Sequence, residues 1–420
     1  MSRRYWVETL GCPKNAVDSA KLIGTLVADG YAAAEGPELA DLVVVNTCAF
    51  IEAARQESID TVLALADTRR EGARLVVTGC LAERYGDELA EALPEADQVA
   101  GFGVPVTLAA KPARSTDRPV PSFDLLNLPR PKSAAPWAYV KIAEGCDRNC
   151  GFCAIPSFRG KQRSRSIQSI LDEVDALEVQ EIVLVAQDLA SYGRDIGQRR
   201  AIVALVREIS RRVARTRLLY LYPSELSDSL IDVMGGTACP YFDLSLQHAS
   251  RRHLRRMRRW GDRDRFVRRI ASIRDRHPDA AFRSSFILGY PGETEEDHDE
   301  LLEFLESSQL DWAGFFPFCP EEGTYAATLP DTVANELMAE RLRECTELQD
   351  AITARKRTAL IGQTVEVLVD RPGVGRSHRE APEIDGVVRL PVEATRRLTG
   401  QFVKAMVTDS NGPDVEAVLA

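Results

Sequence analysis

The sequence predicts an α/β protein with three structural regions: a parallel α/β region, an open partial (βα)6 barrel and a small antiparallel β-barrel. Three observations indicate this. Apolar strands alternate with helical patterns over the first hundred residues, and the same alternation returns over residues 137–355. Short strand patterns separated by Gly- and Pro-containing turns fill residues 361–420. Strand–helix alternation favours parallel sheets, whereas short strands with such turns favour a β-barrel.

In the first region, three apolar runs each end in a cysteine: YWVETLGC at Cys12, LVVVNTC at Cys48 and RLVVTGC at Cys80. Continuous apolar strands are typical of a parallel sheet covered on both faces, where ligands bind at the carboxyl ends of the strands. A single cysteine there is more often a packing residue. For three cysteines at one edge, two interpretations are about equally favoured. They are either packing residues or ligands of one shared metal or cluster. We expect Asn46 and Thr47 to turn the chain so that Cys48 points out of the sheet edge.

Seven prolines in residues 105–136 disfavour regular helix or central strand and predict a linker. The predicted domains are therefore residues 1–104, the linker 105–136, the core 137–360 and the C-terminal barrel 361–420. A closing helix is expected over residues 335–357. Six strands of the core are expected, namely WAYVKIA (137–143), EIVLVAQ (181–187), LLYLYP (218–223), YFDLSLQ (241–247), AAFRSSFILG (280–289) and WAGFFPF (312–318).

Composition narrows the class of protein. The 53 Lys and Arg against 63 Asp and Glu leave a net charge of −10, which disfavours a general nucleic-acid binder. Neither a signal-peptide pattern nor a run of about eighteen apolar residues is found, so we expect a cytoplasmic protein without a membrane span. Nine cysteines in that compartment favour metal or redox work over disulfides. The five histidines lack the paired spacing of a His-based metal site.

The segment KIAEGCDRNCGFCAIP carries Cys146, Cys150 and Cys153 in the spacing C-x3-C-x2-C. Structural zinc sites normally close with four ligands. Three thiolates can instead hold three irons of a cubane four-iron four-sulfur cluster and leave the fourth iron open. This spacing, with Phe152 before the last cysteine and at the end of the first barrel strand, resembles the radical S-adenosylmethionine superfamily. The resemblance implies that the open iron chelates S-adenosylmethionine, whose cleavage yields a 5′-deoxyadenosyl radical able to break an unactivated C–H bond.

The resemblance extends over essentially the whole chain, to the methylthiotransferases, which combine a three-cysteine domain, a TIM-type radical S-adenosylmethionine core and a C-terminal TRAM barrel. It implies that Cys12, Cys48 and Cys80 hold a second four-iron four-sulfur cluster. The implied cofactors are thus two such clusters and S-adenosylmethionine. Four residues are implied to contact that cofactor: Phe152, Gln187, Asp188 and Gly289. A buried strand with a glycine stop explains Gly289 equally well, and Thr294 followed by Asp297 resembles a helix cap. Cys239, Cys319 and Cys345 are interpreted as ordinary residues.

Family members modify either an adenosine in transfer RNA or an aspartate in a ribosomal protein. Five stretches resemble the aspartate-modifying group: ETLGCPKN (8–15), VAQDLASYG (185–193), LSLQHAS (244–250), PEEGTYAATLP (320–330) and RSHREAPEIDG (376–386). The transfer-RNA group usually has Gln and Met at Pro13 and Lys14. The resemblance therefore implies an enzyme that converts an aspartate of small-subunit ribosomal protein twelve to 3-methylthioaspartate. The alternatives are a transfer-RNA adenosine C2 methylthiotransferase (MiaB-like) and a non-catalytic iron–sulfur or zinc protein that binds the ribosome or carries electrons.

Charge bears on the partners. Residues 361–420 hold seven Lys and Arg against nine Asp and Glu, which favours a basic protein over RNA, unless this barrel only packs on the enzyme. Residues 251–276 hold twelve Arg against three Asp. A solvated helix face is the favoured interpretation of that segment, and a contact with ribosomal RNA or another anionic partner is the alternative. An electron donor such as a flavodoxin or ferredoxin is also expected.

Overall fold

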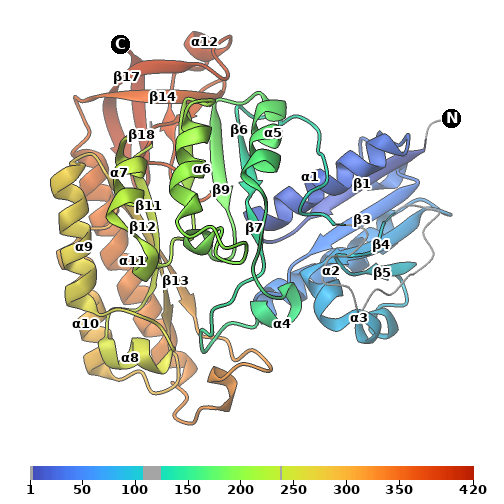
Figure 1. Ribbon diagram of the computed structural model, residues 1–420, viewed down its shortest axis with the longest axis horizontal. Helices are drawn as coiled ribbons and strands as arrows, with labels where there is room; N and C mark the ends of the chain where they lie inside the picture. Colours follow the sequence, from blue (N-terminus) through green and yellow to red (C-terminus); the bar gives the residue numbers. More distant parts are fainter. Residues whose placement is uncertain (1–2, 107–123, 237–238) are drawn as a thin grey trace. The chain divides into compact units, whose positions relative to one another are not determined.

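The computed structural model describes residues 3–106, 124–236 and 239–420 (Figure 1). The chain forms two compact units. The N-terminal unit comprises Met1–Lys132, Lys141–Asp147 and Ala154–Glu173, and the C-terminal unit comprises Ser133–Val140, Arg148–Cys153 and Val174–Ala420. Residues 107–123 of the predicted linker lie outside the described residues. Its segment 124–132 packs on the N-terminal unit, because Leu125 and Leu126 are buried and the Lys21 ammonium donates to the Leu126 carbonyl at 2.8 Å.

The N-terminal sheet is parallel throughout, in the order β2-β1-β3-β4-β5, which confirms the parallel α/β prediction. Its strands are β1 (Arg4–Thr9), β2 (Ala32–Ala33), β3 (Leu42–Thr47), β4 (Arg74–Gly79) and β5 (Gln98–Ala100). Its helices are α1 (Pro13–Ala28), η1 (Pro37–Leu39), α2 (Glu52–Thr68) and α3 (Cys80–Ala92). The later segments of the unit add α4 (Ile155–Arg159), most of α5 (Ile167–Leu177) and the antiparallel pair β7 (Ala143–Glu144) and β8 (Arg163–Ser164).

Every residue of β3 is buried, because helices cover both faces of the sheet (Figure 1). Val43 and Val45 lie in one apolar cluster with residues of α2 and α3. Leu42 and Val44 lie in another with residues of α1. Successive side chains of a strand point to opposite faces, so an unbroken apolar run is what a doubly covered strand requires.

The C-terminal unit contains six core strands, the expected number, in two three-stranded sheets, β10-β9-β6 and β11-β12-β13. A parallel bridge between Leu221 and Leu244 joins them. The strands are β6 (Trp137–Lys141), β9 (Glu181–Val185), β10 (Arg215–Leu218), β11 (Tyr241–Gln247), β12 (Ala281–Leu288) and β13 (Trp312–Pro317). The helices are η2 (Leu189–Ser191), α6 (Ala201–Ser210), η3 (Pro223–Glu225), α7 (Asp228–Gly236), α8 (Arg251–Arg256), α9 (Arg263–Arg276), α10 (Glu295–Ser308), η4 (Ala326–Thr328) and the closing α11 (Asn335–Thr358).

The third core strand was predicted in the wrong place. It spans Arg215–Leu218, not residues 218–223. The predicted run leaves the ladder at Tyr220, whose φ is +65° and whose amide donates to the Asp243 carboxylate at 2.9 Å. The true strand carries Arg215 and Arg217, which are fully buried. Buried arginines on a strand contradict the apolar pattern that identifies core strands in a sequence.

The C-terminal region forms the predicted small closed barrel, in the order β14-β15-β16-β18-β17. Its strands are β14 (Thr364–Arg371), β15 (Val374–Arg376), β16 (Val388–Arg389), β17 (Phe402–Asn411) and β18 (Asp414–Leu419), with the short helix α12 (Val392–Thr395). All pairs are antiparallel except β16 with β18. The run IDGVVRL (384–390) contributes only the two-residue strand β16, and its Asp385 carboxylate accepts from the Ala381 amide and the Tyr241 hydroxyl outside the ladder.

This small barrel is fixed to the core strands by buried charges within the C-terminal unit. The Glu181 carboxylate of β9 accepts from Arg217 at 2.8 Å and from Arg376 of β15 at 2.9 Å. Arg215 donates to the carbonyls of Arg376 and Ser377, at 3.1 Å each. The barrel therefore packs on the core. This agrees with the alternative given above for its acidic composition, namely that the barrel packs on the enzyme. Across the described ranges, no helix has the length and apolarity needed to cross a membrane.

Candidate functional site

The structure brings Cys12, Cys48 and Cys80 to the carboxyl end of one sheet. They follow β1, β3 and β4, which are neighbours, and the register pairs Thr9 with Asn46 and Thr47 with Gly79. Cys48 and Cys80 are buried, and Cys12 is half-buried. Each cysteine lies one to three residues beyond its strand, so the register fixes all three at one edge.

Two glycines allow the loops that carry these cysteines to lie close together. Gly11 has a φ of +89°, and a Cβ at this position would lie 2.8 Å from the Cys48 sulfur. Gly79 has a φ of +94°, and a Cβ there would lie 2.6 Å from the Thr47 amide nitrogen. Side-chain-bearing residues rarely adopt such φ values. These glycines therefore permit both the turns and the close contact between neighbouring loops.

Buried amides tie the three loops together. Asn15 of α1 donates to the carbonyls of Leu10 and Thr47, at 2.9 Å each. Asn46 donates to the Asn15 carbonyl at 2.9 Å, and the Thr47 hydroxyl donates to the Thr78 carbonyl at 2.5 Å. Asn46 and Thr47 are the last residues of β3 and bond this strand end to the neighbouring loops, whereas their expected part in directing Cys48 out of the sheet edge stays a prediction.

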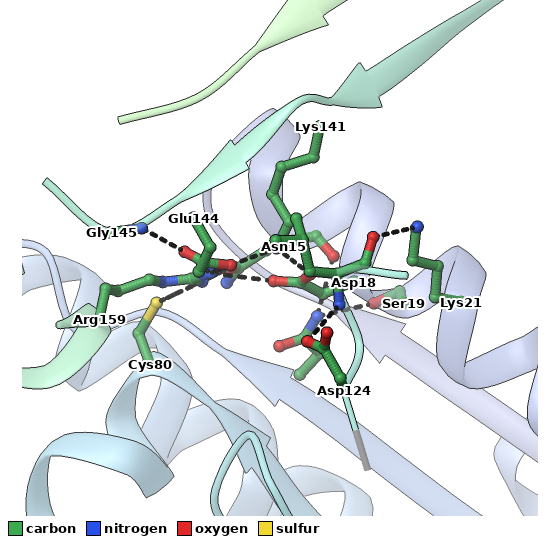
Figure 2. Close-up of polar contacts among 12 residues, drawn as sticks. Asn15, Asp18, Ser19, Lys21, Cys80, Asp124, Lys141, Glu144, Gly145 and Arg159 are labelled. Atoms are coloured by element: carbon green, nitrogen blue, oxygen red, sulfur yellow. Dashed lines mark hydrogen bonds and ion pairs between the residues drawn. The ribbon is translucent and has the colours of Figure 1, made fainter. Parts of the chain in front are cut away.

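Arg159, the last residue of α4, reaches the same place within the N-terminal unit (Figure 2). It donates to the Cys80 sulfur at 3.0 Å and to the Asn15 side-chain oxygen at 2.7 Å. On its other side it contacts the carboxylates of Asp18, at 3.1 Å, and Glu144, at 3.0 Å. The sequence alone offered no signal for this residue, because its partners lie 79 and 144 positions away.

The thiols respond differently to this setting. Burial alone would raise the pKa of Cys12, but the charges of Lys14 and Arg159 and the amides at the start of α1 outweigh it and lower the pKa. Burial raises the pKa of Cys48 to about 11. Burial also raises the pKa of Cys80, against the effect of Arg159. Two of the three thiols therefore need a bound cation to become thiolates at neutral pH.

The donor set fits an iron–sulfur cluster better than a single zinc ion. Around one zinc ion, sulfur atoms at 2.3 Å from the metal lie about 4 Å apart. In the described part of the chain, the group whose ligand atoms all lie within 4.8 Å of one another does not contain these cysteines. Three soft sulfur donors at one sheet edge, farther apart than ligands of a single ion, suit a cubane, whose corners separate its ligands.

That compact group is His248, His253 and Glu293, which the sequence did not indicate. It is a poor cation site. The His248 Nδ1 atom accepts from the Ser250 amide at 3.1 Å, so in the neutral ring Nε2 carries the proton and cannot ligate a metal. Arg341 also lies 3.4 Å from the Glu293 carboxylate and would repel a cation.

The second set of cysteines lies in the loop after β6. In the N-terminal unit, the Cys146 amide donates to the Gly160 carbonyl at 3.0 Å. In the C-terminal unit, the Cys153 amide donates to the Cys150 carbonyl at 3.2 Å, and Arg259 donates to the Cys150 sulfur at 3.3 Å. All three cysteines are half-buried. Arg259 is a site residue that the sequence did not single out within its arginine-rich segment.

The residues implied to contact S-adenosylmethionine follow core strands of the C-terminal unit, except Phe152, which is half-buried in the cysteine loop. Gln187 and Asp188 follow β9. One Asp188 oxygen accepts from Arg148 and Ser191, at 2.6 Å each, whereas the other is buried and has no hydrogen-bond partner among the described residues. That oxygen fits an ammonium group of a ligand.

Gly289 follows β12 with a φ of +75°, and its amide donates to the Glu293 carboxylate. The glycine stop alone accounts for its residue type. The cap that begins α10 is confirmed, since Thr294 and Asp297 form a reciprocal capping box.

Most arginines of residues 251–276 have partners within the unit. Ion pairs with neighbouring elements hold Arg252 to Asp297, Arg256 to Asp331, Arg263 to Glu303, Arg269 to Asp228 and Arg276 to Asp232. Arg274 donates to the last carbonyls of α10, at Ser308 and Gln309. These contacts favour the interpretation as a helix face with paired charges.

Comparison with known proteins agrees with this architecture. Three family profiles match: Uncharacterized protein family UPF0004 over residues 4–101, the Radical SAM superfamily over 140–305 and the TRAM domain over 361–419. Among solved structures, the radical S-adenosylmethionine methyltransferase TsrM of Kitasatospora setae has a TM-score of 0.50 at 15% identity, covering 84% of this chain and 89% of its own. At that identity the match shows the fold.

Curated relatives are much closer in sequence. The ribosomal protein uS12 methylthiotransferase RimO of Kineococcus radiotolerans is 40% identical over 99% of this chain and 97% of its own length. The same enzyme of Moorella thermoacetica is 43% identical over 92% of each chain. Near-complete coverage of both chains at this identity, with all three regions matched in order, shows that the chain belongs to the RimO family of radical S-adenosylmethionine methylthiotransferases.

Proposed function

We propose that this enzyme transfers a methylthio group to an aspartate of ribosomal protein uS12, the small-subunit protein twelve, and forms 3-methylthioaspartate. The observation that carries the proposal is the convergence of Cys12, Cys48 and Cys80 at one sheet edge, in a chain that holds a second, separate set of three cysteines. A reaction that both adds sulfur to carbon and activates a C–H bond has a use for two cluster sites. The family membership of the chain agrees with this assignment.

In this proposal, Cys146, Cys150 and Cys153 hold one four-iron four-sulfur cluster, and Cys12, Cys48 and Cys80 hold the other. When bound, the clusters and S-adenosylmethionine supply an electron, a hydrogen-abstracting radical and the incoming methylthio group. The protein's own contribution is to present three thiolates at each site.

The C-terminal unit orients S-adenosylmethionine. The unpartnered oxygen of Asp188 would accept from the cofactor's ammonium group, and Arg148 holds that carboxylate from its other side at 2.6 Å. Phe152, Gln187 and Gly289 border the cofactor. Burial of Asp188 strengthens such a contact, because little water competes for the carboxylate.

The remaining partners follow from the chemistry. A one-electron reductant of low potential, such as a flavodoxin or ferredoxin, feeds the cluster of Cys146, Cys150 and Cys153. The enzyme acts in the cytoplasm, where its substrate is made. Residues 1–104 serve the sulfur-donating cluster, residues 137–360 form the radical core and residues 361–420 form the TRAM barrel, joined by the linker 105–136. Contact with ribosomal RNA stays the alternative for residues 251–276, because half of their twelve arginines pair with acids.

Mass spectrometry of uS12 tests the substrate. We expect uS12 from cells lacking the enzyme to be lighter by one methylthio substitution on an aspartate-containing peptide, and plasmid-borne enzyme to restore the mass. Reconstituted enzyme should modify uS12 and leave transfer RNA unchanged. Modification of transfer RNA with unmodified uS12 would establish the adenosine C2 activity instead.

Metal content tests the enzyme class. Anaerobic reconstitution should give about eight irons per chain and reductive cleavage of S-adenosylmethionine to 5′-deoxyadenosine. Stoichiometric zinc without cleavage would establish a non-catalytic metal protein.

A further inference from the structure

Arg159 belongs to the segment that follows the Cys146–Cys153 loop, yet its side chain ends beside Cys80 of the other set, within the N-terminal unit (Figure 2). One nitrogen of its guanidinium donates to the Cys80 sulfur at 3.0 Å and to the Asn15 oxygen at 2.7 Å. The Arg159 side chain is only 3% exposed. A full positive charge is therefore held against a sulfur atom where water is largely excluded.

The surrounding charges hold this guanidinium in one orientation. Its second nitrogen contacts Asp18 at 3.1 Å and Glu144 at 3.0 Å, and both carboxylates also pair with Lys141. The ring of Phe102 lies 4.3 Å from the guanidinium carbon. These two cations and two carboxylates carry no net charge together before any cluster is considered.

A hydrogen bond to a ligand sulfur and a nearby cation both stabilise the more negative, reduced form of an iron–sulfur cluster. Hydrogen bonds to the sulfurs, net charge and solvent exposure are among the features that set cluster potentials. A planar guanidinium can contact the sulfur, the Asn15 amide and two carboxylates at once, which the single ammonium of lysine cannot reproduce.

We propose that Arg159 is a positioning residue that orients the Cys80 sulfur and raises the reduction potential of the cluster held by Cys12, Cys48 and Cys80. This inference rests on the proposed function, because it assumes that these cysteines hold a cluster. It adds a device by which the segment after the radical-generating loop controls how readily the sulfur-donating cluster is reduced.

The experiment uses the full chain with Cys146, Cys150 and Cys153 replaced by Ala, so that only the N-terminal cluster contributes a signal. In this background we compare Arg159→Lys, and Arg159→Met combined with Glu144→Gln, which keeps the local charge balanced. Glu144→Gln alone is the reference for the double change. Arg259→Lys is the matched control, because Arg259 makes the same kind of contact to a cysteine that this background lacks.

Iron content and the midpoint potential, measured by redox titration with electron paramagnetic resonance, are the readouts. We expect about four irons per chain in the background protein. Arg159→Lys should lower the midpoint potential, and the double variant should lie below Glu144→Gln alone. Arg259→Lys should leave the potential unchanged.

Two results would contradict different parts of this assignment. A background protein that binds no iron would overturn the proposed second cluster. A background protein that binds four irons, with the same potential and spectrum in both Arg159 variants, would overturn the role of Arg159 and leave the proposed function intact.

Discussion

Glu181 holds the TRAM barrel to the radical core, and its removal should cost the enzyme about 3 kcal/mol of stability at neutral pH. The carboxylate is fully buried and contacts Arg217 at 2.8 Å, Arg376 at 2.9 Å and Arg215 at 3.7 Å. Glu181→Gln leaves these three guanidinium groups buried without their shared anion. Breaking a buried ion pair by removing one partner typically costs about 3–5 kcal/mol.

The pKa of Glu181 gives a second value for the contribution of its carboxylate to the free energy of unfolding. Burial alone would raise this pKa, but Arg376, Arg217 and Arg215 outweigh it and lower the pKa from 4.5 to about 2. At about 1.4 kcal/mol for each unit of pKa, the ionised carboxylate contributes about 3 kcal/mol. Because the folded pKa is below the unfolded one, this contribution is complete above about pH 4.5 and is lost as the pH falls toward 2.

The assay is urea unfolding of the metal-free chain under reducing conditions, followed by tryptophan fluorescence. Trp137 and Trp312 report on this interface, since Arg376 lies 5.6 Å from the Trp137 ring and the Trp312 indole donates to the Arg379 carbonyl at 2.6 Å. The difference between the wild type and Glu181→Gln should shrink as the pH falls below 4.5. The control Glu208→Gln removes a surface partner of Arg211 and Arg212 and should change stability by less than about 0.5 kcal/mol. A Glu181→Gln cost below about 1 kcal/mol at pH 7, or a cost that does not vary with pH, would refute the reasoning.

Three further predictions concern the clusters. Replacing Cys12, Cys48 and Cys80 with Ala should lower the iron content from about eight to about four per chain. This variant should still cleave S-adenosylmethionine but should not insert sulfur. Full product from it would remove the second cluster from the mechanism. Replacing Cys146, Cys150 and Cys153 with Ala should abolish 5′-deoxyadenosine formation, and chromatography that still detects it would contradict their role. Gly11→Ala should reduce iron uptake by the N-terminal site, because a Cβ would lie 2.8 Å from the Cys48 sulfur in a backbone with φ of +89°. The control is Gly72→Ala, where φ is also positive at +78° but a Cβ meets nothing within 4 Å. Iron analysis should show no loss in this control.

The order of the fold and both cysteine sets could be predicted from the sequence, because they depend on local patterns. Strand periodicity predicts where β1, β3 and β4 end, and parallel register then brings the residues that follow to one edge. The C-x3-C-x2-C spacing lies within eight residues. No tertiary knowledge is needed for either inference.

The polar contacts that complete the site were not predictable, because they join residues far apart in the chain. Arg159 meets Cys80 across 79 positions, and Arg259 meets Cys150 across 109. The strand β10 was misplaced for a related reason. Its arginines are tolerated inside the protein only because Glu181 and the carbonyls of Arg376 and Ser377 receive them.

The same contacts change the charge argument for the TRAM barrel. Its composition indicates a net charge of −2, from seven cationic and nine acidic residues. Arg376, Glu380 and Asp385 are turned inward, where they pair within the C-terminal unit. The exposed cations and exposed acids of the barrel are then equal in number. The five cations are Arg371, Arg389, Arg396, Arg397 and Lys404, and the five acids are Glu366, Glu383, Glu393, Asp409 and Glu416. A balanced surface neither attracts a phosphate backbone over distance nor steers a basic protein. The barrel's buried charges instead hold it on the radical core, through the pair of Arg376 with Glu181.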